Sequence, residues 1–230
     1  MKLGILQTGY APDELRGEYG DYDEMFRRLL ARPDIAFETF PVLADRFPAD
    51  LSVADAWLVT GSRCGVYDGF PWIARLEDFL RDLHDARAPL VGICFGHQAI
   101  AEALGGKVEK FSGGWSVGLE YYRVEGREAP AGLLAWHQDQ VVAPPPGAEI
   151  IAASDFCPCA GLRVGSHILT LQPHPEFSPD YVRALVAARR TVIGDAVAAS
   201  ALDSLAAEWP DDFSAYILDF IDAALAAGTR

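Results

Sequence analysis

A short apolar run that ends at a cysteine between two glycines constrains the fold of this chain more than any other feature. Residues 89–93 are apolar throughout, as expected for a parallel strand that is buried on both faces of a sheet. Residues 92–96 read G-I-C-F-G, and a helical pattern over 98–104 follows and stops at a glycine pair. The G-x-C-x-G form is typical of a nucleophile elbow, in which the chain turns sharply from strand to helix and holds a reactive side chain in a strained conformation. Cys94 would then project from the edge of the sheet.

The first half of the chain alternates strands with amphipathic helices. We expect strands over 2–7, 35–41, 54–60 and 89–93, and helices over 22–31, 72–86 and 98–104. The polar, glycine-containing stretch before Tyr22 is expected to be a loop. This alternation predicts an α/β fold, with an open, mostly parallel twisted sheet flanked by helices. Sites in such sheets form beyond the carboxyl ends of the strands, where Gly61 and Cys94 are placed.

The second half of the chain changes character and ends in helices. Strand candidates cover 107–110, 118–124, 149–153, 160–164 and 167–171, and we expect them to add extra antiparallel strands. Helices are expected over 179–190 and from about 196 to 227, with a break near Pro210. A chain of 230 residues fits one domain. We therefore expect a single domain over 1–230, with a catalytic core of about 2–178 and a helical tail of about 179–230.

A histidine and a carboxylate follow the last strand candidate. His174 and Glu176 alternate with prolines that stiffen the backbone. With Cys94 as nucleophile, His174 as base and Glu176 as the orienting acid, the chain could carry out acyl transfer through a thioester. The helix after Cys94 favours the thiolate, and the N–H of Phe95 is a natural oxyanion donor. Taken alone, the elbow could be a buried thiol in a tight turn and the histidine could be structural, but their combination favours catalysis.

Two motifs of the chain resemble the signatures of a known enzyme family. G-I-C-F-G-H-Q at 92–98 and Q-P-H-P-E-F at 172–177 resemble those of class I (triad-type) glutamine amidotransferases, and the resemblance spans roughly residues 2–178. Within the family, the chain is most similar to stand-alone proteins related to the amidotransferase domain of GMP synthetase, and plant γ-glutamyl peptide hydrolases lie near this subgroup. The resemblance implies a flavodoxin-like fold and an activity that needs no metal and no cofactor.

The resemblance also implies a mechanism. Cys94 would attack the side-chain amide of glutamine or of another γ-glutamyl compound, His174 would pass the proton to the departing amine, and Glu176 would orient the imidazole. A γ-glutamyl thioester would form, and water would resolve it. The backbone N–H groups of Gly61 and Phe95 would form the oxyanion hole.

Further residues are assigned to the glutamyl pocket by the same resemblance. Gln98 ends the C-x-G-x-Q pattern and would help to hold the glutamyl group. The segment that contains Trp115 and Ser116 would line the pocket through its backbone. His137 and Asp139 match a W-H-x-D loop at the pocket rim, although a purely loop-stabilising pair is an equal alternative.

One segment departs from the family pattern. The usual Gly-Gly-Pro oxyanion loop is replaced by Thr60, Gly61 and Ser62, so the first glycine and the proline are missing. Gly61 could still supply the oxyanion N–H. The departure puts the rigidity of the loop in question.

Charge, cysteine usage and the N-terminus limit the other functions. Thirty-three acidic residues against 19 Lys and Arg give a net charge of −14, which argues against nucleic-acid and anionic-membrane partners. The spacing of Cys157 and Cys159 does not fit a metal site or a redox motif. We find neither a signal-peptide pattern nor an apolar run long enough to span a membrane, so we expect a cytoplasmic protein with reduced thiols.

The fate of the released amine leaves several functions open. No synthetase motif accompanies the two signatures, so ammonia could pass to a separate synthetase partner. Alternatively, the protein could hydrolyse γ-glutamyl peptides without a partner. A third possibility is a catalytically silent, regulatory member of the fold. A fourth is a relative of the cysteine-elbow stress proteins and peptidases, which the late position of the His-x-Glu pair disfavours.

Overall fold

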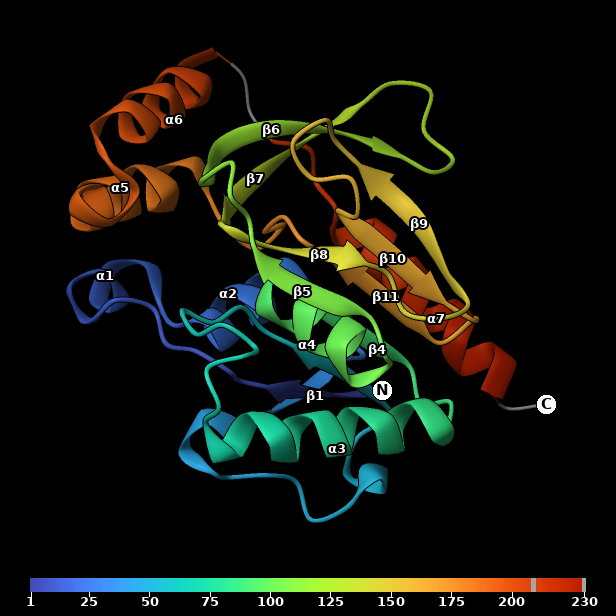
Figure 1. Ribbon diagram of the computed structural model, residues 1–230. Helices are drawn as coiled ribbons and strands as arrows, with labels where there is room; N and C mark the ends of the chain where they lie inside the picture. The colour runs from blue at the N-terminus through green and yellow to red at the C-terminus, as the bar shows by residue number, and fades with distance from the viewer. Residues whose placement is uncertain (208–209, 229–230) are drawn as a thin grey trace.

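A twisted sheet forms the centre of the computed structural model, which describes residues 1–207 and 210–228 (Figure 1). Within these residues the sheet has nine strands in the order β2-β1-β3-β4-β11-β10-β9-β6-β7. The first five strands in this order are parallel, and the rest are antiparallel to their neighbours. The parallel strands are β2 (Ala36–Phe40), β1 (Lys2–Leu6), β3 (Ala56–Val59), β4 (Leu90–Ile93) and β11 (Ile168–Leu171). The antiparallel strands are β10 (Gly161–Val164), β9 (Ala148–Ala153), β6 (Ser116–Val124) and β7 (Ala131–His137).

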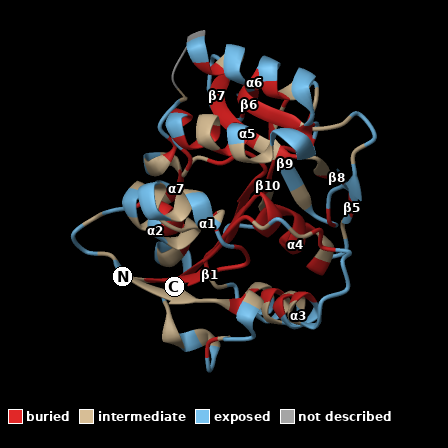
Figure 2. Cartoon of the chain, turned by 90° about the vertical axis from the view of Figure 1, so that its left-hand side faces the viewer, coloured by how far each residue is buried: buried red, intermediate tan, exposed pale blue. Residues whose placement is uncertain are grey.

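Helices cover both faces of the parallel strands, because the apolar side chains of these strands point alternately to the two sides. Leu3 and Ile5 pack in one core cluster with residues of α2 (Tyr22–Leu29) and α7 (Ser214–Gly228). Leu6 packs in another cluster with residues of α3 (Pro71–Asp85) and α4 (Phe95–Ala103). Figure 2 shows β1 buried between these layers, with exposed residues on the outer faces of the helices. The predicted α/β architecture is confirmed.

The helices after the last strand belong to the body of the molecule. α5 (Pro179–Ile193) and α6 (Asp195–Ala207) pack against β6 and β7 in a third core cluster. In α7, Ile217 and Ile221 are completely buried in the same cluster as β1 and β4. We therefore propose that the chain is one domain. The expected break near Pro210 adjoins residues 208 and 209, and the end of the tail includes 229 and 230; these four positions lie outside the described residues.

Two expectations for the connecting segments were wrong or incomplete. The stretch expected to be a loop contains helix α1 (Asp13–Tyr19), which has acidic residues in its first turn and contacts α5 through Glu14 and Tyr19. The sequence did not indicate β7 or β8 (Asp139–Ala143), and β8 pairs with β5 (Lys107–Lys110) in a separate two-stranded sheet. Residues 42–44 and 51–53 form short 3₁₀ turns.

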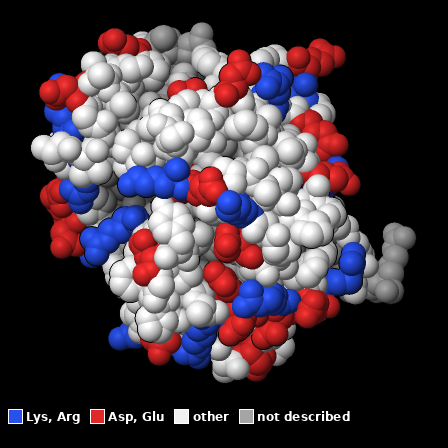
Figure 3. Space-filling view, in the orientation of Figure 1, with Lys and Arg blue, Asp and Glu red and all other residues white. Residues whose placement is uncertain are grey.

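Charges of both signs are mixed on the visible surface. Figure 3 shows Lys and Arg side chains interspersed with Asp and Glu on the visible face, rather than gathered in a separate basic patch. Among the described helices, none has the length and apolar character required to cross a bilayer.

Candidate active site

The cysteine elbow lies where β4 meets α4. Cys94 adopts φ 54° and ψ −102°, a left-handed conformation that is costly for any residue other than glycine. Its backbone N–H donates to the carbonyl of Leu171 at 2.8 Å, and its carbonyl accepts from the N–H of Gln98 at 3.1 Å. A Cβ atom on Gly96 would collide with the Val59 carbonyl, so the turn can pack against β3 only with glycine there. The strained turn presents the thiol at the carboxyl edge of the parallel strands.

The structure brings His174 and Glu176 to the same edge, in the loop after β11. Nδ1 of His174 lies 2.7 Å from Oε1 of Glu176, and the two side chains are 5% and 1% exposed. The backbone N–H of His174 donates to the carbonyl of Leu134 at 2.8 Å, which ties this loop to β7. Because Nδ1 is engaged by the carboxylate, Nε2 is the nitrogen left for proton transfer.

The imidazole is held between an aromatic ring and a glycine. The ring of Phe177 stacks on that of His174 with a centroid separation of 4.0 Å and an interplanar angle of 3°. On Gly61, a Cβ atom would lie only 3.0 Å from Cε1 of His174 and 3.7 Å from Cβ of Cys94. Gly61 therefore lies directly against Cys94 and His174. Phe177 had been quoted in the motif without a role, and its position directly after Glu176 is the signal that could have identified it.

Electrostatics couple the three groups. Burial disfavours the charged ring of His174, but the charges of Glu176 and Cys94 and their hydrogen bonds outweigh it and raise the pKa of His174 to about 10. A carboxylate and a thiolate on either side of one imidazole are what a thiolate–imidazolium pair requires.

The end of β7 and the turn into β8 form one wall of the site. The Cys94 thiol lies 3.9 Å from the backbone carbonyl of Trp136. The indole ring of Trp136 packs against that of Trp115, with ring centroids 6.3 Å apart. Ser116 is buried at the start of β6 and pairs with His137 at the end of β7. The two segments assigned to the pocket from the resemblance therefore lie side by side.

Asp139 makes hydrogen bonds to several other residues of this wall. Its carbonyl accepts from Nε2 of Gln98 at 2.9 Å and lies 3.2 Å from Nδ1 of His137. The same nitrogen of Gln98 also donates to the side chain of Gln172 at 3.0 Å. The Asp139 carboxylate accepts from the hydroxyl of Tyr67 at 2.8 Å, and burial raises its pKa. Gln98 thus holds the turn at Asp139.

His137 is buried and electrically neutral. Burial lowers the pKa of His137 to about 3, the Asp139 carbonyl opposes the shift, and the charge of His174 adds to it. A carbonyl can only accept, so Nδ1 of His137 carries the proton and Nε2 is an acceptor. Among the described residues, that buried Nε2 atom has no hydrogen-bond partner.

The other histidines and cysteines are not part of the cluster of Cys94, His174 and Glu176. Nδ1 of His97 lies 2.7 Å from the Thr170 hydroxyl. His84 and His167 stack on each other, with Nδ1 of His84 3.1 Å from Nε2 of His167. Burial raises the pKa of Cys157 to about 12 and thus keeps it protonated. No group of three or more His, Cys, Asp or Glu side chains in residues 1–207 and 210–228 could hold a metal ion.

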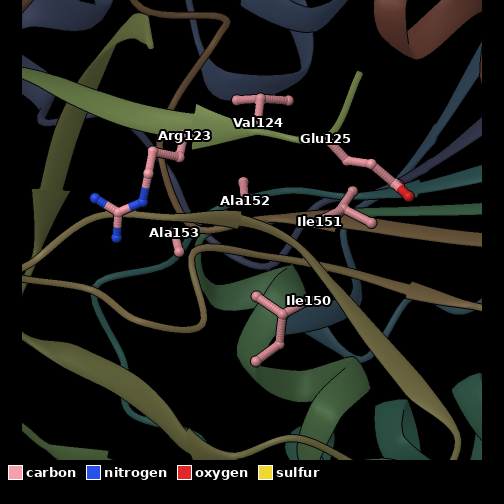
Figure 4. Close-up of a pocket in the computed structure, with 7 residues that line it drawn as sticks. All are labelled: Arg123, Val124, Glu125, Ile150, Ile151, Ala152 and Ala153. Atoms are coloured by element: carbon pink, nitrogen blue, oxygen red, sulfur yellow. The ribbon is translucent and has the colours of Figure 1, made fainter. Parts of the chain in front are cut away.

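Within the described residues, one cavity lies away from the predicted site and another reaches it. One, of 310 Å³, is a groove between β6 and β9, and Figure 4 shows Arg123, Val124 and Glu125 facing residues 150–153 across it. None of the predicted site residues line this groove. The other, of 370 Å³, is lined by residues of α1, α2 and α5 and reaches Glu176.

Comparisons with known proteins agree with the motifs. The family model described as "Glutamine amidotransferase class-I" matches residues 28–188. Gamma-glutamyl peptidase 4 of Arabidopsis thaliana is 31% identical over 176 residues, which is 70% of each chain. The glutamine-hydrolysing GMP synthase of Psychrobacter arcticus is 32% identical over 173 residues, covering 68% of this chain and 31% of that protein. The crystal structure of a glutamine amidotransferase from Methylobacillus flagellatus superposes with a TM-score of 0.74 at 20% identity, covering 99% of this chain and 94% of that one, and supports the fold.

Proposed function

The chain belongs to the class I glutamine amidotransferase family, and on that basis we propose that it hydrolyses the side-chain amide of glutamine or of a related γ-glutamyl compound. The single observation that carries the proposal is the convergence of Cys94, His174 and Glu176 at one edge of the sheet. The strained elbow, the 2.7 Å contact between His174 and Glu176 and the raised pKa of His174 are the properties that a cysteine hydrolase needs.

In the first half-reaction, the Cys94 sulfur attacks the γ-carbonyl carbon of the substrate. The carbonyl oxygen becomes an oxyanion, which the N–H groups of Gly61 and Phe95 stabilise. As the C–N bond breaks, Nε2 of His174 gives its proton to the departing amine, which leaves a γ-glutamyl thioester on Cys94. Glu176 holds the imidazole in the required tautomer throughout.

In the second half-reaction, water resolves the thioester. Nε2 of His174 takes a proton from the water, the oxygen bonds to the γ-carbonyl carbon, and the C–S bond breaks. Glutamate is released, and Cys94 returns to its starting form. The same two N–H groups stabilise the second oxyanion.

The glutamyl group is proposed to lie against the wall formed by β6 and β7. Trp115 and Ser116 contribute backbone groups, and His137 supports the pocket rim through its contact with the Asp139 carbonyl. The Asp139 carboxylate attracts the substrate's ammonium group. Gln98 acts indirectly, because its amide nitrogen is committed to the Asp139 carbonyl and to Gln172.

A second candidate function differs only in the amine that leaves. The similarity to a γ-glutamyl peptidase favours cleavage of γ-glutamyl peptides without a partner, whereas the similarity to a GMP synthase favours ammonia supply to a separate synthetase. Turnover of a panel that contains glutamine and γ-glutamyl dipeptides separates the two. Rapid cleavage of dipeptides by the isolated protein favours the peptidase. Glutamine turnover that is low until a synthetase is added favours ammonia supply.

The proposed function is tested by labelling the nucleophile. A glutamine-mimicking diazo-ketone should form one adduct, which mass spectrometry should map to Cys94. Cys64→Ala is a matched control, because Cys64 is the most accessible of the other cysteines and should not affect labelling. If Cys94 stays unmodified, or if no γ-glutamyl compound is hydrolysed, the chain is a silent member of the fold.

A further inference from the structure

We propose that Thr8, in the turn after β1, is a positioning residue for the oxyanion hole. The inference rests on the proposed function, and it identifies what replaces the missing glycine and proline of the oxyanion loop. Thr8 and Thr60 are both completely buried, and they are joined although 52 residues separate them in the sequence. Thr8 lies just beyond the end of β1, and Thr60 lies just beyond the end of the adjacent strand β3.

A network of hydrogen bonds joins Thr8, Thr60 and the Gly61 carbonyl. The backbone N–H of Thr8 donates to Oγ1 of Thr60 at 3.0 Å, and the Thr60 hydroxyl donates to the Gly61 carbonyl at 3.1 Å. The Thr8 hydroxyl donates to the Thr60 carbonyl at 2.9 Å and also lies 3.0 Å from the Gly61 carbonyl. One proton on each hydroxyl suffices to satisfy this arrangement. Because water does not reach these groups, the bonds hold the loop firmly.

Because the peptide between Thr60 and Gly61 is planar, these hydrogen bonds also fix the direction of the Gly61 N–H. The Thr60 carbonyl and the Gly61 N–H belong to one planar trans peptide, so they point in opposite directions. With the carbonyl fixed toward Thr8, the N–H of Gly61 points away from Thr8, while Gly61 itself lies against Cys94 and His174. Holding the carbonyl therefore fixes the direction of the oxyanion donor.

The neighbouring residue brings the turn close enough for these bonds. A Cβ atom on Gly9 would lie 2.8 Å from the Gly61 carbonyl oxygen and 2.9 Å from Cα of Ser62. The turn after β1 thus packs backbone to backbone on the oxyanion loop, which only glycine permits here. Thr8 and Gly9 together make the loop at 60–62 rigid, in place of the missing glycine and proline.

Thr8→Val and Thr8→Ser test the inference, because valine keeps the shape of threonine without the hydroxyl and serine keeps the hydroxyl. With a γ-glutamyl substrate, Thr8→Val should lower kcat about 10- to 100-fold with little change in KM, since misaiming one oxyanion donor costs somewhat less than removing it. Thr8→Ser should retain most of the wild-type kcat. Thr39→Val, on the outer strand β2, is a matched control that should leave kcat unchanged.

A second measurement separates a misdirected Gly61 N–H from general damage to the site. A γ-glutamyl aldehyde adds to Cys94 and places an oxygen in the oxyanion hole, whereas iodoacetamide alkylates the same thiol without doing so. Thr8→Val should weaken aldehyde binding by about the factor lost in kcat, and alkylation should stay within twofold of wild type. Equal losses in both measurements, or failure of Thr8→Ser to rescue, would overturn the positioning role.

Failure of the proposed function gives a different pattern. In that case the wild-type protein hydrolyses no γ-glutamyl compound and does not bind the aldehyde. A crystal structure of Thr8→Val then decides the inference by itself. A rotated Thr60–Gly61 peptide supports the positioning role of Thr8, and an unchanged peptide orientation refutes it.

Discussion

Oε1 of Glu176 lies 2.7 Å from Nδ1 of His174, in a setting where both side chains are almost completely buried. The carboxylate therefore acts on the ring with little screening by water, and together with Cys94 it raises the pKa of His174 to about 10 against the opposing effect of burial. This contact helps to orient the ring, selects its tautomer and contributes to the proton affinity of the proposed base.

The first prediction concerns stability against pH. His174 binds its proton more tightly in the folded protein than in the unfolded chain, where the pKa is about 6.5. The stabilisation from the protonated pair should therefore be complete below about pH 6.5 and should be lost as the pH rises toward the folded-state value of about 10. Denaturant titrations of wild type and His174→Gln should differ by about 2 kcal/mol near pH 6, with a smaller difference at pH 10. A constant difference would contradict the raised pKa.

The second prediction concerns the strain at Cys94. Its φ of 54° is unfavourable for a residue with a Cβ atom, so Cys94→Gly should be more stable than Cys94→Ala by about 1 kcal/mol. Both variants should lose hydrolysis completely while keeping the fold. Thermal or urea unfolding measures the difference, and circular dichroism checks the fold. Turnover by either variant would show that Cys94 is not the nucleophile.

The third prediction concerns the ring stacked on His174. Phe177→Leu keeps an apolar side chain but loses the flat face, so it should lower kcat about 10-fold by loosening the imidazole. Its free energy of unfolding should fall by only about 1 kcal/mol, because leucine nearly fills the space. A changed pH profile of kcat would distinguish loss of ring positioning from a general loss of folded protein. Phe177→Tyr, which retains the aromatic face, is the control that should keep the wild-type profile.

The fourth prediction separates the two roles of Asp139. Asp139→Asn removes the charge but keeps the carbonyl that binds Gln98 and His137. If the carboxylate attracts the substrate's ammonium group, KM should rise about 10-fold, the equivalent of one charge-assisted hydrogen bond, while kcat changes little. Tyr67→Phe removes the hydroxyl that bonds the carboxylate at an exposed position, and it should change stability by less than about 0.5 kcal/mol. An unchanged KM in Asp139→Asn would leave Asp139 with only its loop-stabilising role.

Local patterns predicted the parallel half of the fold well. The strands β1, β3, β4 and β11 were expected from short, mostly apolar runs, because strands buried on both faces of a sheet are rich in apolar residues. β7 was missed although it is mostly buried, since its apolar residues show no alternation and a short apolar run is not distinctive in isolation. α1 was missed because it buries none of its own residues and is held by contacts with α5.

The sequence by itself determined the family and the proposed chemistry of the site: a cysteine at a strand–helix turn, a His-x-Glu pair after a strand, and one family whose signatures contain both. These signals are readable because each depends on residues only a few positions apart. The tertiary structure decided what stands around them: Phe177 stacked on His174, Gln98 bonded to Asp139, and Thr8 locked to Thr60. The last two are contacts across more than forty residues. They form only when the sheet brings the strand ends to one edge, and no local pattern records which side chains will meet there.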